Sequence, residues 1–238
     1  MIKKTILALA ALTAGVSAQA QTESSALSVT VDVTYVSDYV FRGAKLDDAS
    51  IQPSVEAAYG DFYAGLWYSS SYRDNASPAE TDLYAGYGFQ VTDVIKLDGG
   101  LTRYIYSNTN QSSDSTEIFV GATADVTLSP SLYYYYDFDL EVSSVEASIG
   151  YSLPVDAINA SLDLTGKVGY VYNHDAAPAA VEDYTYFSAG VAVPFKLNDS
   201  ATLTVGVDYI HNTEKASAGY NHNDNDIVVA KAGVSIGF

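Results

Sequence analysis

The sequence predicts an all-β protein, a closed antiparallel transmembrane β-barrel of about twelve strands. Apolar and polar residues alternate with a period of two along most of the chain, and no long apolar run follows residue 20. Hydrophobic residues nevertheless make up 48% of the chain. Because they are dispersed at alternate positions, transmembrane helices are excluded and strands with one apolar face remain. Short turns that alternate with longer polar connections give the third observation.

The amino terminus has the layout of a secretory signal peptide. Lys3 and Lys4 precede an apolar run over residues 5–16, and small residues at 17–20 supply a cleavage site after Ala20. The run is too short for a transmembrane anchor, which needs about 20 residues. No cysteine offers a lipidation point, so a lipoprotein is excluded. We therefore expect a signal peptide at 1–20 and one outer-membrane barrel domain at 21–238.

Period-2 patterning then predicts the strands in order. They fall at 27–35, 51–59, 62–71, 80–89, 95–106, 116–126, 131–140, 144–151, 160–170, 184–194, 202–209 and 228–238. Two of them are ambiguous. In 95–106 a regular alternation puts Arg103 on the apolar face, so Gly99-Gly100 is expected to carry a bulge that reverses the pattern. In 184–194 both faces are mostly apolar.

The connections support the barrel independently. One set is short, at 60–61, 91–94, 128–130, 153–156 and 197–199. The other set is longer and polar, at 37–50, 72–79, 107–115, 173–183 and 212–225, with one short exception near Glu141. Short periplasmic turns and long external loops alternate in this way in outer-membrane barrels. An even strand number also brings the two ends of the sheet together, as hydrocarbon requires, since an open edge there would leave backbone groups unsatisfied.

The last residue, Phe238, closes an alternating strand. A strand that ends on a carboxy-terminal aromatic residue resembles the last strand of bacterial outer-membrane barrels. By that resemblance Phe238 is interpreted as the membrane-insertion signal, with the barrel-assembly machinery and outer-membrane lipid as partners. Tyrosines near strand ends fit interfacial girdles, although tyrosine is also a good strand former; they include Tyr35, Tyr59, Tyr68, Tyr87, Tyr106, Tyr151, Tyr170 and Tyr209.

Three segments resemble a known family. They are VSDYVFRG at 36–43, FYAGLWYSS at 62–70 and TDLYAGYGF at 81–89. In this order they are similar to the TorF family, bacterial outer-membrane β-barrels regarded as porins and formerly of unknown function. The resemblance implies an outer-membrane barrel with a pore role in a Gram-negative bacterium, and it supplies no catalytic residues.

The charge balance narrows the partners. The formal net charge is −18, and loss of the signal peptide removes two lysines and no acidic residue. Such a balance argues against nucleic acid and anionic lipid surfaces as partners. The chain has no cysteine, so no disulfide framework is possible. No zinc, phosphate-loop or dinucleotide motif is present, and we expect no cofactor.

The polar faces of the strands are expected to line the interior. The candidate pore-lining residues are Asp32, Glu56, Asp82, Glu117, Asp125, Asp137, Asp139, Glu146, Asp163, Lys167, Asp208 and Lys231. Carboxylates around a narrow aqueous pore concentrate cations and repel anions. The alternative is that the acids pair with the few bases and merely keep an occluded interior wet. Arg42, at the mouth of the first strand, either pairs inward with Asp38 or Glu56 or anchors the first external loop.

The histidines offer little chemistry. His174, His211 and His222 fall in or beside the external loops. The loop around His222 has oxygen donors but lacks the glycine and glutamate of an EF-hand, so no metal site is expected. A rim hydrolase would need a serine beside His174 or His211, and Ser188 is a distant candidate.

Together these features predict a porin-like channel of the outer membrane that passes small hydrophilic solutes by passive diffusion and favours cations. It is not expected to be an enzyme. The alternatives are a non-conducting barrel with a partner-binding or structural role, a barrel hydrolase, and a soluble periplasmic barrel with a ligand cavity.

Overall fold

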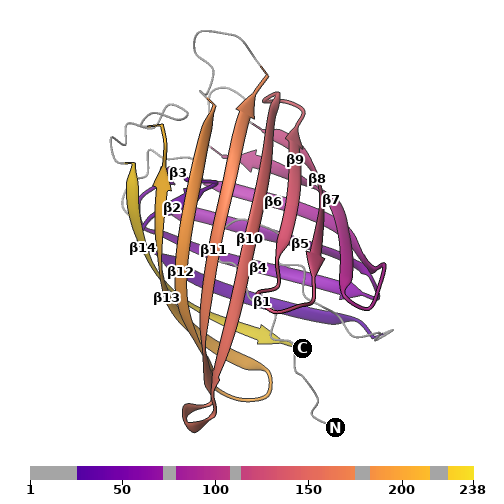
Figure 1. Cartoon of the computed structure of the whole chain (residues 1–238), viewed down its shortest axis with the longest axis vertical. Helices are drawn as coiled ribbons and strands as arrows, with labels where there is room; N and C mark the ends of the chain where they lie inside the picture. The colour runs from indigo at the N-terminus through magenta and orange to yellow at the C-terminus, as the bar shows by residue number, and fades with distance from the viewer. Residues whose placement is uncertain (1–25, 72–78, 108–113, 175–182, 215–224) are drawn as a thin grey trace.

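The computed structural model describes residues 26–71, 79–107, 114–174, 183–214 and 225–238. The expected signal peptide at 1–20 lies outside these residues. The described chain forms a closed antiparallel barrel of twelve strands (Figure 1). They are β1 (Ser28–Val36), β4 (Ser50–Tyr59), β5 (Phe62–Ser71), β6 (Glu80–Gln90), β7 (Ile95–Tyr106), β8 (Ser115–Ala124), β9 (Ser131–Asp137), β10 (Val142–Val155), β11 (Ala160–Asn173), β12 (Tyr184–Lys196), β13 (Ala201–Asn212) and β14 (Asp226–Gly237). The predicted fold class and strand number are confirmed.

The last strand closes the sheet on the first. β1 pairs with β4 on one side and with β14 on the other, and every other strand pairs with its neighbours in sequence. Phe238 continues this pairing beyond β14, because its backbone N–H donates to the Val29 carbonyl at 2.9 Å. Closure leaves no free strand edge, which is what a hydrocarbon environment demands.

The two ends of the barrel differ as expected. Connections of two to six residues join the strands at the end where β1 begins and β14 ends, and we call this the turn end. A single helical turn, η1 (Asp156–Ile158), occupies one of them. The opposite end carries connections of eight or more residues, except for the four-residue connection between β9 and β10, and is called the loop end. The predicted loops at 72–79, 107–115, 173–183 and 212–225 join strands whose ends meet there, and most of their residues lie outside the described ones.

Side chains alternate between the two faces of every strand. Large apolar residues stand exposed on the outer face, for example Val33, Ile51, Leu101 and Val207. A continuous apolar exterior of this kind suits lipid rather than water. Most of the expected girdle tyrosines share that exterior, but Tyr106 faces inward and donates a hydrogen bond to Glu80. No helix in the described part of the chain is long and apolar enough to cross a membrane.

The segment after β1 is not an open external loop. Within the expected loop 37–50, β2 (Tyr39–Phe41) and β3 (Ala44–Asp47) form a hairpin. This β2–β3 hairpin packs inside the barrel. Val40 shares a buried hydrophobic cluster with the inward-facing Ile210 and Val229, and Ala44 shares a second one with Val171. Sequence alternation did not reveal this, since a three-residue strand carries too little periodicity.

The expected bulge in β7 is wrong. Pairing with β6 and β8 runs without a register shift through Gly99 and Gly100. Arg103 therefore does lie on the outer face, near the loop end. There it forms ion pairs with Asp114 at 3.5 Å and Asp139 at 3.4 Å. These partners come from the loop-end connections before β8 and after β9, so local sequence could not show them.

Candidate functional site

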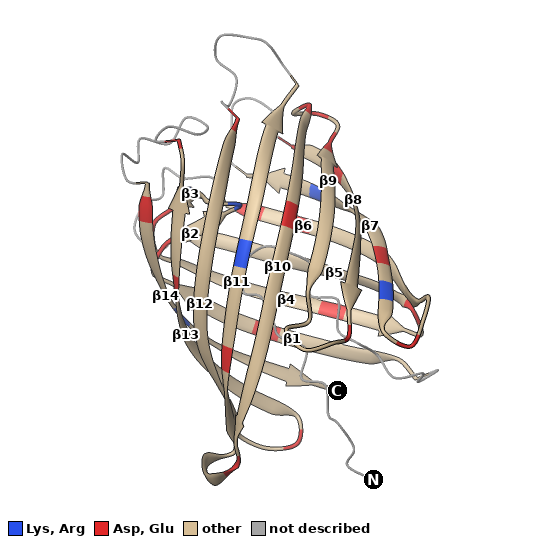
Figure 2. Ribbon diagram, in the orientation of Figure 1, with Lys and Arg blue, Asp and Glu red and all other residues tan. Residues whose placement is uncertain are grey.

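The barrel interior is strongly acidic. Inward-facing carboxylates come from strands all round the wall, and Figure 2 shows how widely acidic residues are spread over the ribbon and how few basic ones accompany them. They are Asp32, Glu56, Glu80, Asp82, Asp98, Glu117, Asp137, Glu146, Asp163 and Asp208. Lys96, Lys167 and Lys231 face the same interior, and the β2–β3 hairpin brings in Arg42. Lys196, at the last position of β12, lies at the rim with Asp199.

The hairpin turn is built to reach across this interior. Arg42 and Gly43 have φ of +46° and +79°, the pattern of a type I′ turn. Gly43 also lies against Tyr186 of β12, and a side chain at position 43 would overlap that residue. The Asn212 side chain donates to the Gly43 carbonyl at 3.1 Å. Glycine is needed here for conformation and for the close approach to the wall.

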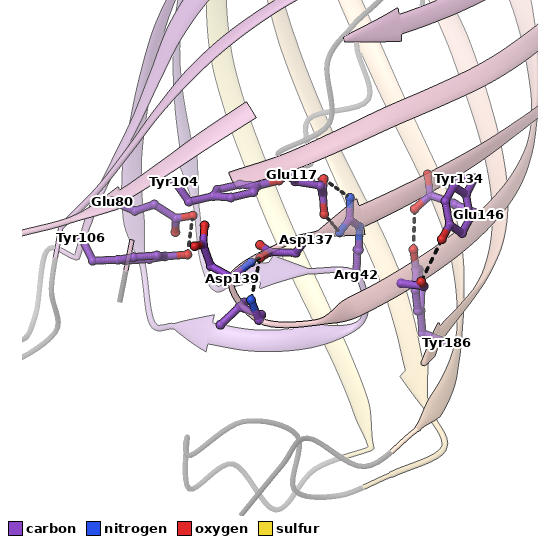
Figure 3. Close-up of polar contacts among 12 residues, drawn as sticks. Arg42, Glu80, Tyr104, Tyr106, Glu117, Tyr134, Asp137, Asp139, Glu146 and Tyr186 are labelled. Atoms are coloured by element: carbon purple, nitrogen blue, oxygen red, sulfur yellow. Dashed lines mark hydrogen bonds and ion pairs between the residues drawn. The ribbon is translucent and has the colours of Figure 1, made fainter. Parts of the chain in front are cut away.

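Arg42 crosses to the opposite wall and binds Glu117 of β8 (Figure 3). Its two terminal nitrogens donate to the two carboxylate oxygens at 2.5 and 2.8 Å. The guanidinium also lies 3.9 Å from the ring centroid of Tyr135, and the Tyr104 hydroxyl donates to Glu117 at 3.1 Å. A bidentate pair of this kind fixes geometry as well as charge. The expectation that Arg42 sits at the mouth is therefore corrected: it pairs inward, and with Glu117 rather than Asp38 or Glu56.

Two more ion pairs tie neighbouring strands together inside the barrel. Lys167 of β11 binds Glu146 of β10 at 2.8 Å, and Lys231 of β14 binds Asp208 of β13 at 2.5 Å. Tyr186 donates a further hydrogen bond to Glu146, as Figure 3 shows. The inward-facing lysines predicted from sequence thus neutralise only two of the ten carboxylates.

Neutral donors hold most of the other carboxylates. Tyr84 donates to Glu56 at 3.1 Å, and Tyr63 donates to Asp98 at 3.0 Å. These carboxylates also lie near Lys96. Serine and threonine hydroxyls donate to Asp163 and Asp32. Hydroxyl donors stabilise a carboxylate without cancelling its charge, so the interior stays negative.

The structure places most predicted pore-lining residues on the inner face, with two exceptions. Asp125 follows the end of β8 and is exposed in the turn to β9. Asp139 follows β9, which ends at Asp137, and binds Arg103 at the outer rim. Both expected strands are shorter than predicted, because each aspartate belongs to the following turn.

Sequence reasoning missed three inward-facing groups, Glu80, Asp98 and Lys96. Glu80 is the first residue of β6, where strand boundaries are hardest to fix. Asp98 and Lys96 precede the pair of glycines that was expected to reverse the pattern. Their even positions in β7, in phase with Thr102 and Tyr104, were the signal that could have found them.

The histidines do not assemble a catalytic triad among the described residues. Ser143 lies 2.7 Å from His174 at the outer rim, but the Tyr134 hydroxyl is its other partner. His211 instead pairs with Asp226 at 2.8 Å. Ser188, the serine considered from sequence, faces inward opposite Lys167. The loop around His222 lies outside the described residues, and the described part contains no cluster of three or more metal-ligating acids, histidines or cysteines.

Comparison with known proteins places the chain in a family. It belongs to the Gcw_chp family of bacterial proteins of unknown function, whose model matches residues 20–238. No curated protein matches the chain.

Solved structures show the same fold at low sequence identity. The KdgM porin aligns with a TM-score of 0.61 and 13% identity, covering 88% of this chain and 99% of that one. The NanC porin gives 0.56 and 13%, covering 87% and 98%. An outer-membrane channel from Pseudomonas putida F1 gives 0.53 and 10%, covering 89% and 95%. The fold is therefore that of outer-membrane porins.

Proposed function

We propose that this protein is an outer-membrane channel of the TorF type, through which small hydrophilic solutes diffuse passively and cations pass in preference to anions. The observation that carries the proposal is the uncompensated charge of the interior. Ten inward-facing carboxylates of the wall strands meet Arg42 and three inward-facing lysines away from the rim, and hydroxyl groups solvate most of the remainder. Lys45 of the hairpin does not offset this charge, because it is paired with Asp38 and Asp48. A wall of this charge raises the local concentration of cations.

The outer surface supports a place in lipid. Exposed Val, Leu, Ile, Phe and Tyr side chains cover the outer face of the barrel, and the short turns and long loops segregate to opposite ends. By the pattern of such barrels, the turn end would face the periplasm and the loop end the outside. We propose the outer membrane of a Gram-negative bacterium as the location, reached after cleavage of the signal peptide, with the barrel-assembly machinery as the insertion partner.

The β2–β3 hairpin favours a second candidate. It contacts inward-facing residues from walls on opposite sides, such as Trp67, Glu117 and Val229. A hairpin that spans the interior in this way can also keep the barrel closed to solutes. A closed barrel would serve a structural or partner-binding role. Conductance separates the two candidates.

Planar-bilayer recording of the mature protein in a KCl gradient tests the proposal. The expected result is discrete channels whose reversal potential has the sign of cation preference. A reversal potential that favours chloride would overturn the selectivity. Correctly folded protein that shows no conductance at all would favour the closed barrel. The Lys231→Met and Asp163→Asn variants should shift the reversal potential in opposite directions, since one removes a positive and the other a negative interior charge.

A further inference from the structure

Two inward-facing carboxylates on β6 form no ion pair with a basic side chain in the described part of the chain. Glu80 and Asp82 are alternate residues of one strand, so both side chains emerge on the inner face. Each is only 4% exposed. Asp82 is also close enough to Glu117 to interact with its charge, but both carboxylate oxygens of Glu117 already accept hydrogen bonds from Arg42. Two like charges buried side by side without a counterion are strongly unfavourable.

Two buried polar atoms at this place have no hydrogen-bond partner. Across the described residues, the atoms in that state are the Asp82 Oδ1 and the Tyr39 hydroxyl. They come from different elements, the barrel wall and the hairpin, and both lie beside the Glu80 carboxylate. Tyr39 and Asp82 approach Glu80 closely enough to interact with it, although neither forms a hydrogen bond of good geometry with it. Buried polar groups in proteins are nearly always satisfied, so this pair of oxygens points to an additional ligand.

The surroundings close the site. Tyr39 is 5% exposed, and its ring packs on Trp67 of β5 with the centroids 5.4 Å apart. The Tyr106 hydroxyl donates to one oxygen of Glu80 at 3.0 Å, as Figure 3 shows. The remaining groups offered to a ligand are therefore carboxylate and phenol oxygens. Among the residues that the structure describes, no basic side chain forms a hydrogen bond or ion pair with them.

We propose that Glu80, Asp82 and the Tyr39 hydroxyl form a binding site for one divalent cation of the Ca²⁺ class. Such ions prefer oxygen ligands and complete their shell with water. One divalent ion matches the two carboxylate charges, and its bond to Tyr39 would fasten the hairpin to the wall. With two carboxylates rather than three or more, the affinity should be weak, with a Kd of about 10⁻⁴–10⁻³ M. Binding at this site does not require the barrel to conduct.

The single tryptophan of the chain provides the readout, because Trp67 lies against Tyr39. The mature protein, folded in detergent micelles, is titrated with Tb³⁺ while tryptophan is excited. The expected result is saturable sensitised emission that Ca²⁺ displaces. Asp82→Asn should weaken binding at least tenfold. Tyr39→Phe, which keeps the ring and removes the oxygen, should weaken it by a smaller factor.

Asp163→Asn is the matched control, because Asp163 also faces inward but is held by Ser152 and Ser161 near the turn end. It should leave the titration unchanged. Heat-modifiable migration on gels verifies that each variant is folded. Two results would overturn the site: emission that does not saturate, or emission that is the same in wild type, Asp82→Asn and Tyr39→Phe. Either result would mean that Glu80 and Asp82 share a proton instead of binding a cation. Since the titration needs no conductance, its failure is distinguishable from failure of the proposed channel.

Discussion

The Arg42–Glu117 pair should contribute far more to stability than an exposed ion pair. The two side chains are 11% and 4% exposed, so neither charge is well solvated if the other is removed. Truncating one member of a buried pair costs about 3–5 kcal/mol. Arg42→Met and Glu117→Gln should each lower the free energy of unfolding by that amount. With a urea m value of about 2 kcal/mol/M, a loss of about 4 kcal/mol moves the unfolding midpoint by about 2 M.

A double-mutant cycle isolates the pair from its surroundings. Arg42 also stacks on Tyr135 and Phe41, and Arg42→Met loses those contacts whether or not Glu117 is present. They therefore cancel in the cycle, which leaves a coupling energy of about 3 kcal/mol between the two charges. Single-channel conductance should rise in Arg42→Met, because the hairpin loses its tether to β8.

The assay is urea unfolding of the folded protein in detergent, followed by Trp67 fluorescence. A coupling energy below about 0.5 kcal/mol is the value of an exposed pair. That result would mean that the hairpin does not hold Arg42 against Glu117 in the interior. The position of the hairpin inside the barrel would then be wrong, whatever the conductance of the wild type.

Three further changes test separate parts of the structure. Deletion of Phe238 should reduce the yield of membrane-inserted protein on heat-modifiability gels, because the residue extends the pairing with β1. The ion selectivity of the inserted fraction should be unchanged, because Phe238 lines no interior surface. Gly43→Ala should destabilise the protein by about 1–3 kcal/mol in the same urea assay, since alanine disfavours φ of +79° and would overlap Tyr186. An unchanged unfolding midpoint would mean that the hairpin turn does not lie against Tyr186. Lys231→Met should lower the free energy of unfolding by about 3–5 kcal/mol, because it leaves Asp208 buried and unpaired. Lys196→Met removes one member of an exposed pair and should lower it by less than about 1 kcal/mol. Equal effects would contradict the burial assigned to Lys231.

Regular alternation made the barrel predictable. A strand with one apolar face repeats its signal over many residues, so strand number, the two sets of connections and the inward position of residues such as Glu146 and Asp208 followed from sequence. Closure followed from backbone chemistry, because hydrocarbon tolerates no unpaired edge. The alternation of β7 was also predictable: a strand without a bulge places Arg103 on the outer face and Asp98 on the inner one, as the structure has them.

The interior hairpin was not predictable by that route. Its strands are three and four residues long, and the bond that defines it joins residues 75 positions apart, Arg42 and Glu117. Nothing local in the sequence distinguishes an arginine that reaches across a barrel from one that anchors an external loop. The same holds for the unsatisfied oxygens of Tyr39 and Asp82, which come together only when the hairpin folds inward.

We expect cations to cross this barrel beside the hairpin, along an acid-lined interior. The chain has no cysteine, so an Asp163→Cys variant carries one reactive thiol on the inner face near the turn end. In single-channel recordings, a cationic thiol reagent added on the loop-end side should reduce the current stepwise, and an anionic reagent of similar size should react far more slowly. Modification that occurs only from the turn-end side would show that the hairpin closes the path. Faster reaction with the anionic reagent would contradict the cation preference of the interior.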